Sequence, residues 1–224
     1  MTYGRDIGRK FYEDGNVRRY PGNTIVGCVA PGSLGFEVMD NLRQMVVDAG
    51  MDSHLILMPG SSYHMTVLVG VNDQGRCAPQ WPEKLPKDAS MDEADDFVSS
   101  AVASAKLPGV MRMRFTKMRL DHGGLIAMAV PEDDAQLVQL DAFRNQVAET
   151  MGRYMPDHDH YIYHVTLAYT RVLAEGEDEK RAQEMLQKMD AYLAQQPVFT
   201  VEPPYMAYYD NMFHFSHTRI PRDK

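Results

Sequence analysis

The feature that most constrains the fold is an internal repeat at an offset of 100 residues. A buried strand, a proline, an amphipathic helix and a second strand occur twice in the same order. The tetrapeptides YHMT (63–66) and YHVT (163–166) share three identities in four positions. Further identities are Pro31 with Pro131, Val38 with Val138, Val47 with Val147 and Met51 with Met151. The repeat predicts two similar lobes, over residues 24–71 and 124–170. A duplication relic without function is the alternative.

The remaining periodicity places both lobes in one domain of residues 1–224, with a C-terminal helix and strands that complete the sheets. Residues 1–23 are predicted to be an irregular lead-in. Residues 72–92 are rich in proline and glycine and are predicted to be a loop or insertion. We expect helices over residues 34–49, 93–105, 134–152 and 177–195. We expect strands over residues 24–30, 55–58, 63–71, 110–120, 125–130, 161–170, 198–201, 205–209 and 212–217.

The repeated tetrapeptide has a simple meaning on a strand. Side chains two residues apart share a face of the sheet. His64 and Thr66 therefore point the same way, and Met65, Val67 and Val69 are expected to point oppositely, into a core. The second copy repeats this alternation. Each lobe thus offers one imidazole and one hydroxyl on one surface.

Two such pairs facing each other suit phosphodiester chemistry. Imidazole titrates near neutrality, so one of His64 and His164 can accept a proton while the other donates one. Thr66 and Thr166 can hydrogen-bond the non-bridging oxygens of the phosphate. The sequence does not say which histidine is the base.

The motifs YHMTVLV (63–69) and YHVTLAY (163–169) resemble the His-x-Thr signatures of the 2H phosphoesterase superfamily, which includes bacterial RNA ligase-like proteins and cyclic nucleotide phosphodiesterases. The resemblance spans residues 24–217. Residues 20–24 also resemble an uncharacterised bacterial branch.

This resemblance implies an α+β, bilobal fold, in which the antiparallel sheets of two duplicated lobes flank a central cleft and the helices lie outside. It implies hydrolysis of a small cyclic phosphate or 2′,3′-cyclic nucleotide, with no cofactor and no obligatory metal. His64 and His164 carry over as catalytic residues, and Thr66 and Thr166 as phosphate-binding residues.

Charge and composition narrow the partners. The net charge is −8 and the isoelectric point is about 5.4, which argues against a basic groove for long nucleic acid. Residues 67–69 and 167–169 contain no basic side chain. A small phosphorylated or nucleotide ligand is therefore favoured. With no long apolar run, no secretory leader and two cysteines, we expect a cytoplasmic monomer without membrane contact.

Other residues are weaker candidates for binding the substrate. They are Arg18 and Tyr20 in the lead-in, Arg112 and Arg114 on an alternating strand, and Tyr209 and His214 near the C-terminus. For Arg112 and Arg114 the alternative is a solvated strand face, and for Tyr209 it is aromatic packing. His214 and His217 face opposite sides of their strand, so one of them could reach the cleft.

Several conspicuous residues are expected to lie outside the site. Tyr63 and Tyr163 should pack in the core or at a lobe edge, and Tyr169 should face away unless a bulge intervenes. The run Asp157–His160 resembles a metal cluster, but a solvated turn is the better interpretation. We place two further histidines, His54 and His122, on the surface.

Two other function classes are open. One is a binding module that keeps the phosphate pocket without useful catalysis. The other is a metal hydrolase that uses His64 and His164 as ligands.

Overall fold

The computed structural model describes residues 1–221, which form four α-helices, two short 3₁₀ helices and nine strands. The helices are α1 (Leu34–Asp48), α2 (Met91–Ala103), α3 (Asp134–Met151) and α4 (Glu177–Leu193), with 3₁₀ helices η1 (Gly60–Ser62) and η2 (His158–His160). The strands are β1 (Gly22–Cys28), β2 (Leu55–Leu57), β3 (His64–Asn72), β4 (Met111–Leu120), β5 (Gly124–Pro131), β6 (His164–Thr170), β7 (Phe199–Val201), β8 (Tyr205–Asn211) and β9 (His214–Ser216).

All the strands pair antiparallel in the order β7-β4-β5-β6-β3-β1-β8-β9, and β2 adds to β6. The α+β architecture with antiparallel strands is confirmed. The two halves do not form separate sheets, however. The pair Met65–Val165 joins β3 to β6 and makes the sheet continuous. The two strands that carry the repeated tetrapeptide are therefore direct neighbours at the centre of the sheet.

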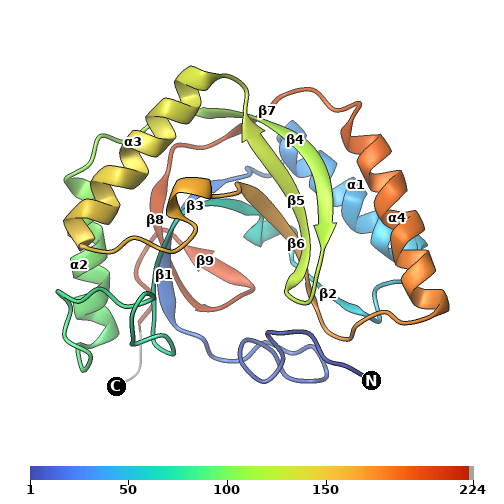
Figure 1. Ribbon diagram of the computed structural model, residues 1–224, viewed down its shortest axis with the longest axis horizontal. Helices are drawn as coiled ribbons and strands as arrows, with labels where there is room; N and C mark the ends of the chain where they lie inside the picture. The colour runs from blue at the N-terminus through green and yellow to red at the C-terminus, as the bar shows by residue number, and fades with distance from the viewer. Residues whose placement is uncertain (222–224) are drawn as a thin grey trace.

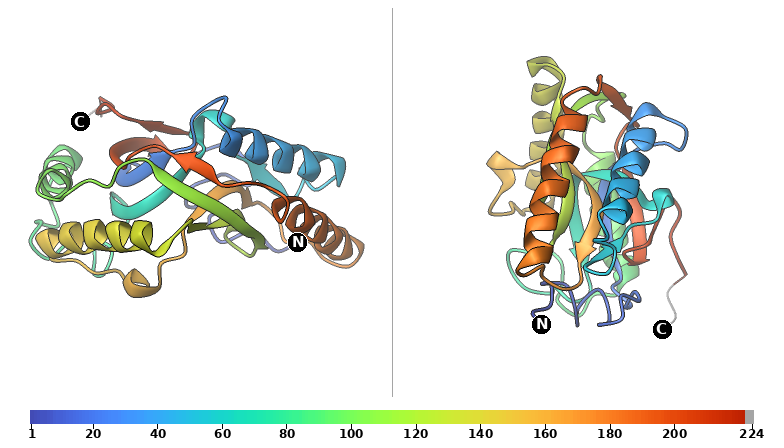
Figure 2. Two further views of the ribbon diagram at one scale, coloured as in Figure 1. Left: turned by 90° about the horizontal axis from the view of Figure 1, so that it is seen from above. Right: turned by 90° about the vertical axis from the view of Figure 1, so that its right-hand side faces the viewer.

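The helices lie in two pairs at opposite ends of the molecule (Figures 1 and 2). One pair is α2 with α3, which packs on β3, and the other is α1 with α4, which packs near β4 and β7. Beneath them, the side chains of Met65, Val67, Val165 and Leu167 are fully buried. Burial of each such side chain contributes about 1.5 to 3 kcal/mol. No helix within residues 1–221 is long and apolar enough to cross a membrane.

The predicted helix ends agree with the chain's capping chemistry. The hydroxyl of Ser33 accepts a hydrogen bond from the backbone of Phe36 at 3.2 Å, which caps α1. Gly152 ends α3 in the left-handed region at φ +64°, where glycine avoids the steric cost of a side chain. The second helix begins at Met91, two residues earlier than expected, because Ser90 and Glu93 form a capping box.

The N-terminal segment, residues 1–21, has no regular strand or helix but is tied to the sheet. Its isolated bridges join Tyr3 to Val172 and Phe11 to Val17. Phe11 is fully buried and packs on the ring of Tyr169, with centroids 4.9 Å apart. In Figure 1 this dark blue segment runs along the lower edge of the molecule, between β1 and β2. The N-terminal segment is therefore packed against the core, although it has no regular secondary structure.

Candidate functional site

Both repeated His and Thr pairs line one cavity of about 400 Å³. His64 and Thr66 come from β3, and His164 and Thr166 from β6. All four side chains are half-buried, whereas the residues between them in sequence are buried on the other face. The strand alternation thus directs the four polar side chains into the cavity.

The pairing of β3 with β6 fixes how the two pairs lie relative to each other. In an antiparallel pair, one step forward on one strand faces one step back on the other. Because Met65 pairs with Val165, this register sets His64 across from Thr166 and His164 across from Thr66. Directly opposed residues have Cβ atoms about 4.5 to 5.5 Å apart. Each imidazole thus lies beside the hydroxyl of the other half, and the two imidazoles lie diagonally.

The two imidazoles are held in the same way. Nδ1 of His64 lies 2.8 Å from the carbonyl oxygen of Ser62, and Nδ1 of His164 lies 2.8 Å from that of Ile162. A carbonyl only accepts hydrogen bonds, so Nδ1 is the donor in both rings. In the neutral form, Nε2 is then the free acceptor. Both rings therefore keep Nε2 available for proton transfer.

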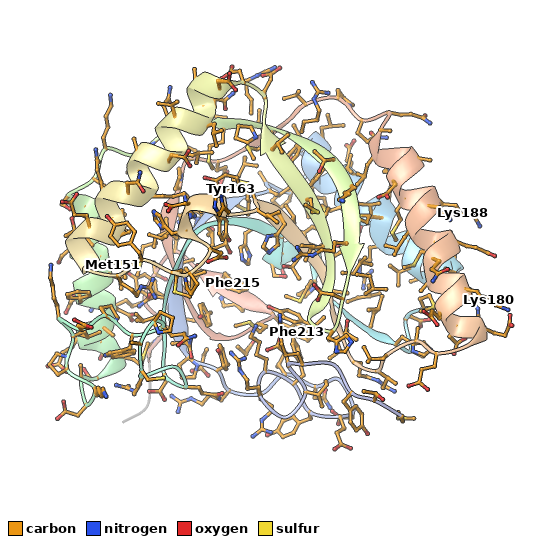
Figure 3. All side chains as sticks on the ribbon, viewed as in Figure 1. Met151, Tyr163, Lys180, Lys188, Phe213 and Phe215 are labelled. Atoms are coloured by element: carbon orange, nitrogen blue, oxygen red, sulfur yellow. The ribbon has the colours of Figure 1, made fainter. Side chains whose placement is uncertain are left out.

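The two imidazoles differ in their surroundings. Burial lowers the pKa of His64 to about 4, against the opposing effect of the Ser62 carbonyl, and the nearby His164 ring lowers it further. The ring of Phe215 packs on His64 with centroids 4.2 Å apart. Figure 3 shows Phe215 between the two helix pairs. Burial also lowers the pKa of His164, against the effect of the Ile162 carbonyl. Both surroundings thus favour the neutral form of the ring, and they do so by different contacts.

A bulge in each central strand changes which residues face the cavity. Ile25 of β1 pairs with Leu68, and the next residue, Val26, pairs with Thr66, so Val67 is an extra residue in β3. In the same way, Leu125 of β5 pairs with Ala168 and Ile126 pairs with Thr166, so Leu167 is an extra residue in β6. The expectation that Val69 faces the core is therefore wrong, because the bulge turns it into the cavity.

The second bulge acts on Tyr169, which lines the cavity instead of facing away. The condition attached to that expectation, an intervening bulge, is met. Position 69 carries valine and position 169 carries tyrosine, so the repeat places a small and a large side chain at equivalent points of the site.

A buried arginine supports the first bulge. Arg144 of α3 is 2% exposed and donates to the carbonyl oxygens of Val67 at 2.5 Å and His158 at 2.7 Å. Its guanidinium also lies over the ring of Tyr161, 4.3 Å from the centroid. Tyr161 lines the cavity, and its hydroxyl lies near that of Thr66. Arg144 thus contacts both the strand and the ring that position Thr66.

The comparisons with known proteins fit this geometry. A family model described as "2H-phosphodiest: Domain of unknown function (DUF1868)" matches residues 10–123, which include the first His-x-Thr pair. The chain belongs to this 2H phosphodiesterase family. The resemblance seen in the sequence is thus confirmed. None of the curated proteins gives a match.

One solved structure extends the likeness over 96% of the chain. A conserved protein of unknown function from Agrobacterium tumefaciens, ATU0111, is 31% identical, with a TM-score of 0.86 over 96% of this chain and 91% of that one. TT0787 of Thermus thermophilus is 15% identical, with a TM-score of 0.48 over 83% of this chain and 87% of that one. Escherichia coli LigT, solved with ATP, is 8% identical, with a TM-score of 0.46 over 84% and 87%.

Two of the weaker candidates reach the cavity of this 2H protein. Tyr20 and Tyr209 both line it, and their rings stack with centroids 6.4 Å apart and an interplanar angle of 9°. A Cβ at Gly22 would lie 2.4 Å from the Tyr209 hydroxyl. Glycine at this point of β1 therefore lets Tyr209 lie close against the strand.

The structure does not bring the other four candidates to the cavity. Arg18 lies over the ring of Tyr12, on another part of the surface. Arg112 and Arg114 are exposed on β4, where Arg112 pairs with Glu132. His214 is exposed at the start of β9. For His214 the physical reason is strand alternation, because Phe215, the next residue of β9, is the one that turns toward His64.

The remaining expectations concern residues near the motifs. Tyr63 and Tyr163 are buried at 1% and 4% exposure, and burial raises the pKa of each phenol. In the run Asp157–His160, His158 is buried and contacts Asn145 at 2.7 Å, while Asp157 lines the cavity. This part of the turn is therefore not simply solvated. Among residues 1–221, no group of three potential ligands could hold a metal ion.

The placement of one predicted surface histidine is wrong. His54 is half-buried, and its Nε2 lies 3.1 Å from a carboxylate oxygen of Asp178. Nδ1 of His54 lies 3.3 Å from the carbonyl oxygen of Val172 in the loop after β6, and Asp178 belongs to the first turn of α4. His122 is exposed, as expected.

Sequence reasoning missed several residues of the 2H cavity. They are Arg9 and Lys10 of the N-terminal segment, together with Thr24, Met58, Ser62, Val69, Asn72, Gln80, Asp157, Tyr161, Tyr169, Met212 and Phe215. Val69 and Tyr169 had a usable signal, because they occupy equivalent positions of the repeat. Arg9 and Lys10 had none, because only tertiary folding carries an irregular segment to this place.

Proposed function

We propose that this chain is a metal-independent phosphodiesterase that hydrolyses a small cyclic phosphate or 2′,3′-cyclic nucleotide. The observation that supports this most strongly is the crossed arrangement of two His and Thr pairs in one cavity, with both Nε2 atoms free. Membership of the 2H phosphodiesterase family makes phosphodiester chemistry the expected use of that arrangement.

The mechanism follows from the two imidazoles. His64 is the general base, because its more buried ring favours the neutral form. Its Nε2 takes a proton from water as the water oxygen forms a bond to phosphorus. His164 is the general acid, and the negative charge of the bound phosphate favours its protonated form. Its Nε2–H gives a proton to the departing ribose oxygen as the phosphorus–oxygen bond breaks.

The threonines and the strand register orient the phosphate. The hydroxyls of Thr66 and Thr166 donate to the non-bridging oxygens, where negative charge increases in the transition state. Because each hydroxyl lies beside the opposite half's imidazole, a phosphate held by both has one imidazole on each side. This in-line placement is what separate base and acid roles need.

The test is turnover of 2′,3′-cyclic nucleotides by the purified chain after treatment with a chelator. We expect conversion to a nucleoside monophosphate by the wild type and none by the His64→Ala, His164→Ala double variant. Titration calorimetry of both proteins with a nucleoside 2′-monophosphate supplies the control for binding. Binding without turnover, or turnover restored only by added metal, would contradict the proposal.

A further inference from the structure

Two cations of the N-terminal segment line the same cavity as the His and Thr pairs. Arg9 and Lys10 are both cavity residues, and they belong to a segment outside the repeat. The side chain of Lys10 is 17% exposed and that of Arg9 is 51% exposed. Lys10 is thus held against the protein, while Arg9 reaches further toward solvent.

The positions of both side chains are fixed by aromatic residues of the cavity. Nη2 of Arg9 donates to the Tyr20 hydroxyl at 2.6 Å. Nζ of Lys10 lies 4.8 Å from the ring centroid of Tyr169 and 5.7 Å from that of Tyr20. These contacts hold two positive charges beside the rings without neutralising them.

Arg9 and Lys10 together carry more positive charge than their carboxylate partner neutralises. Within residues 1–221, the carboxylate that pairs with these two cations is Asp6, at 3.7 Å from Arg9 and 3.4 Å from Lys10. Two positive charges against one negative charge leave a net charge of +1. The other charged cavity residue, Asp157, immediately precedes η2, which lies well apart from the N-terminal segment in Figure 1. The surplus therefore faces the end of the cavity near Tyr169.

The surplus charge is separate from the phosphate site of the two histidines. Arg9 and Lys10 are held by Tyr20, Tyr169 and Asp6, none of which belongs to the two His and Thr pairs. Two different sets of residues in one cavity thus offer positions for an anion. This arrangement suits two anionic groups joined by a spacer such as a ribose, and the rings of Tyr20 and Tyr169 lie beside the second group.

We infer that Arg9 and Lys10 form a second anion site, and that the substrate is a cyclic nucleotide with a further phosphate at the far end of its ribose. The inference rests on the proposed function, since it names the substrate class of the same cavity. The catalytic phosphate lies between the histidines. The second phosphate is bound by the guanidinium and the ammonium and takes no part in bond cleavage.

The experiment compares ligands that differ only in the second phosphate. Titration calorimetry measures binding of adenosine 2′-monophosphate and adenosine 2′,5′-bisphosphate, and a kinetic assay compares 2′,3′-cyclic AMP with and without a 5′-phosphate. We expect wild-type protein to bind the bisphosphate about 10- to 100-fold more tightly, which is the usual effect of charge-assisted hydrogen bonds. The double variant Arg9→Gln, Lys10→Gln should reduce this ratio to within about 3-fold.

Two control variants keep the test specific. Arg18→Gln removes a cation of the same segment outside the cavity, and it should preserve the wild-type ratio. Lys10→Arg preserves the charge at the site and should retain most of the preference. Unchanged binding of adenosine 2′-monophosphate by the double variant reports that its cavity remains folded.

Each failure has a distinct meaning. Equal binding of the two ligands by the wild type, or an unchanged ratio in the double variant, would overturn the second anion site. Absence of turnover with both cyclic nucleotides would instead overturn the proposed function. In that case the binding ratio still decides whether Arg9 and Lys10 recognise a second phosphate.

Discussion

The half around His64 and the half around His164 have the same backbone arrangement, but different side chains pack around their motifs. Each histidine bonds the carbonyl two residues before it at 2.8 Å, and each strand has a bulge at the same point of the repeat. The side chains around them differ. His64 packs on Phe215, which comes from a strand outside the repeat.

The helices of the two halves also differ. Arg144 of α3 is buried and donates to the β3 carbonyl at Val67, whereas its repeat equivalent on α1, Gln44, is exposed and bonds Asp48. A second arginine, Arg153, donates to the carbonyl oxygen of Gly70 at 2.7 Å. The arginines of the second half thus stabilise the strand of the first. Symmetry of the backbone therefore supplies two like imidazoles, and we propose that the different side chains around them separate their roles.

The single histidine variants test this division of roles most strongly. His64→Ala and His164→Ala should each lower kcat/KM about 10²- to 10⁴-fold, the usual effect of losing a general base or acid. The wild-type kcat/KM should rise as pH increases through about 4, where His64 loses its proton. It should fall as pH rises toward and past 6.5, because the pKa of His164 is lowered from that value.

The pH profiles of the variants decide which histidine has which role. Residual activity in His64→Ala should lose the acidic limb, and residual activity in His164→Ala should lose the alkaline limb. Steady-state kinetics from about pH 3 to about pH 9 measures both limbs, because the range extends on both sides of the pKa of His64. The reverse assignment of limbs would exchange the base and the acid, and two unchanged profiles would remove both from the mechanism.

The arginine that supports the first half gives the next largest effect. Arg144→Met leaves the carbonyl groups of Val67 and His158 without their donor, and we expect a loss of about 2 to 4 kcal/mol in the free energy of unfolding. The matched control is Gln44→Met, at the equivalent and exposed position, where the change should stay within about 0.5 kcal/mol. Urea unfolding measures both. Similar small losses in the two variants would show that the halves are supported alike.

The two threonine variants should lower kcat/KM by less than the histidine variants do, and should differ only modestly from each other. Thr66→Val and Thr166→Val each remove one donor to the phosphate, for which we expect about a 10-fold loss in kcat/KM. Thr66→Val should be the more damaging, because it also removes a polar neighbour of the Tyr161 hydroxyl. In the first half, the residue equivalent to Tyr161 is Ser61, which has no ring beside the phosphate site. The measurement is kcat/KM with a 2′,3′-cyclic nucleotide. A larger loss in Thr166→Val would reverse the comparison.

The smallest effect should come from the ring over His64. Phe215→Leu reduces the burial of the imidazole, and reduced burial raises a lowered histidine pKa toward its ordinary value. The acidic limb of kcat/KM should therefore move to higher pH by less than about one unit. The alkaline limb should stay in place, because the imidazole against which the Phe215 ring packs is that of His64. NMR titration of the two imidazoles would detect the shift directly, and movement of both would argue against a local effect.

The order of elements followed from periodicity, and the four polar residues followed from the repeat. The ranges expected for α1 and α3 agree closely with the structure, because helical periodicity and the capping residues at their ends, Ser33 and Gly152, are local features. Val69 was misplaced because strict alternation contains no bulge, and a bulge forms only when a neighbouring strand pairs on both sides of it. His54 was placed on the surface because its partner Asp178 is 124 residues away along the chain.

By itself, the sequence determined that two equivalent strands each present a histidine and a threonine on one face, because side-chain direction along a strand is a local property. Only the tertiary structure decided that these strands are neighbours at the Met65–Val165 pair, so that each imidazole lies beside the opposite hydroxyl. It also decided that Phe215, Arg9 and Lys10 join the cavity. Those contacts depend on long-range packing of segments outside the repeat, which no local pattern encodes.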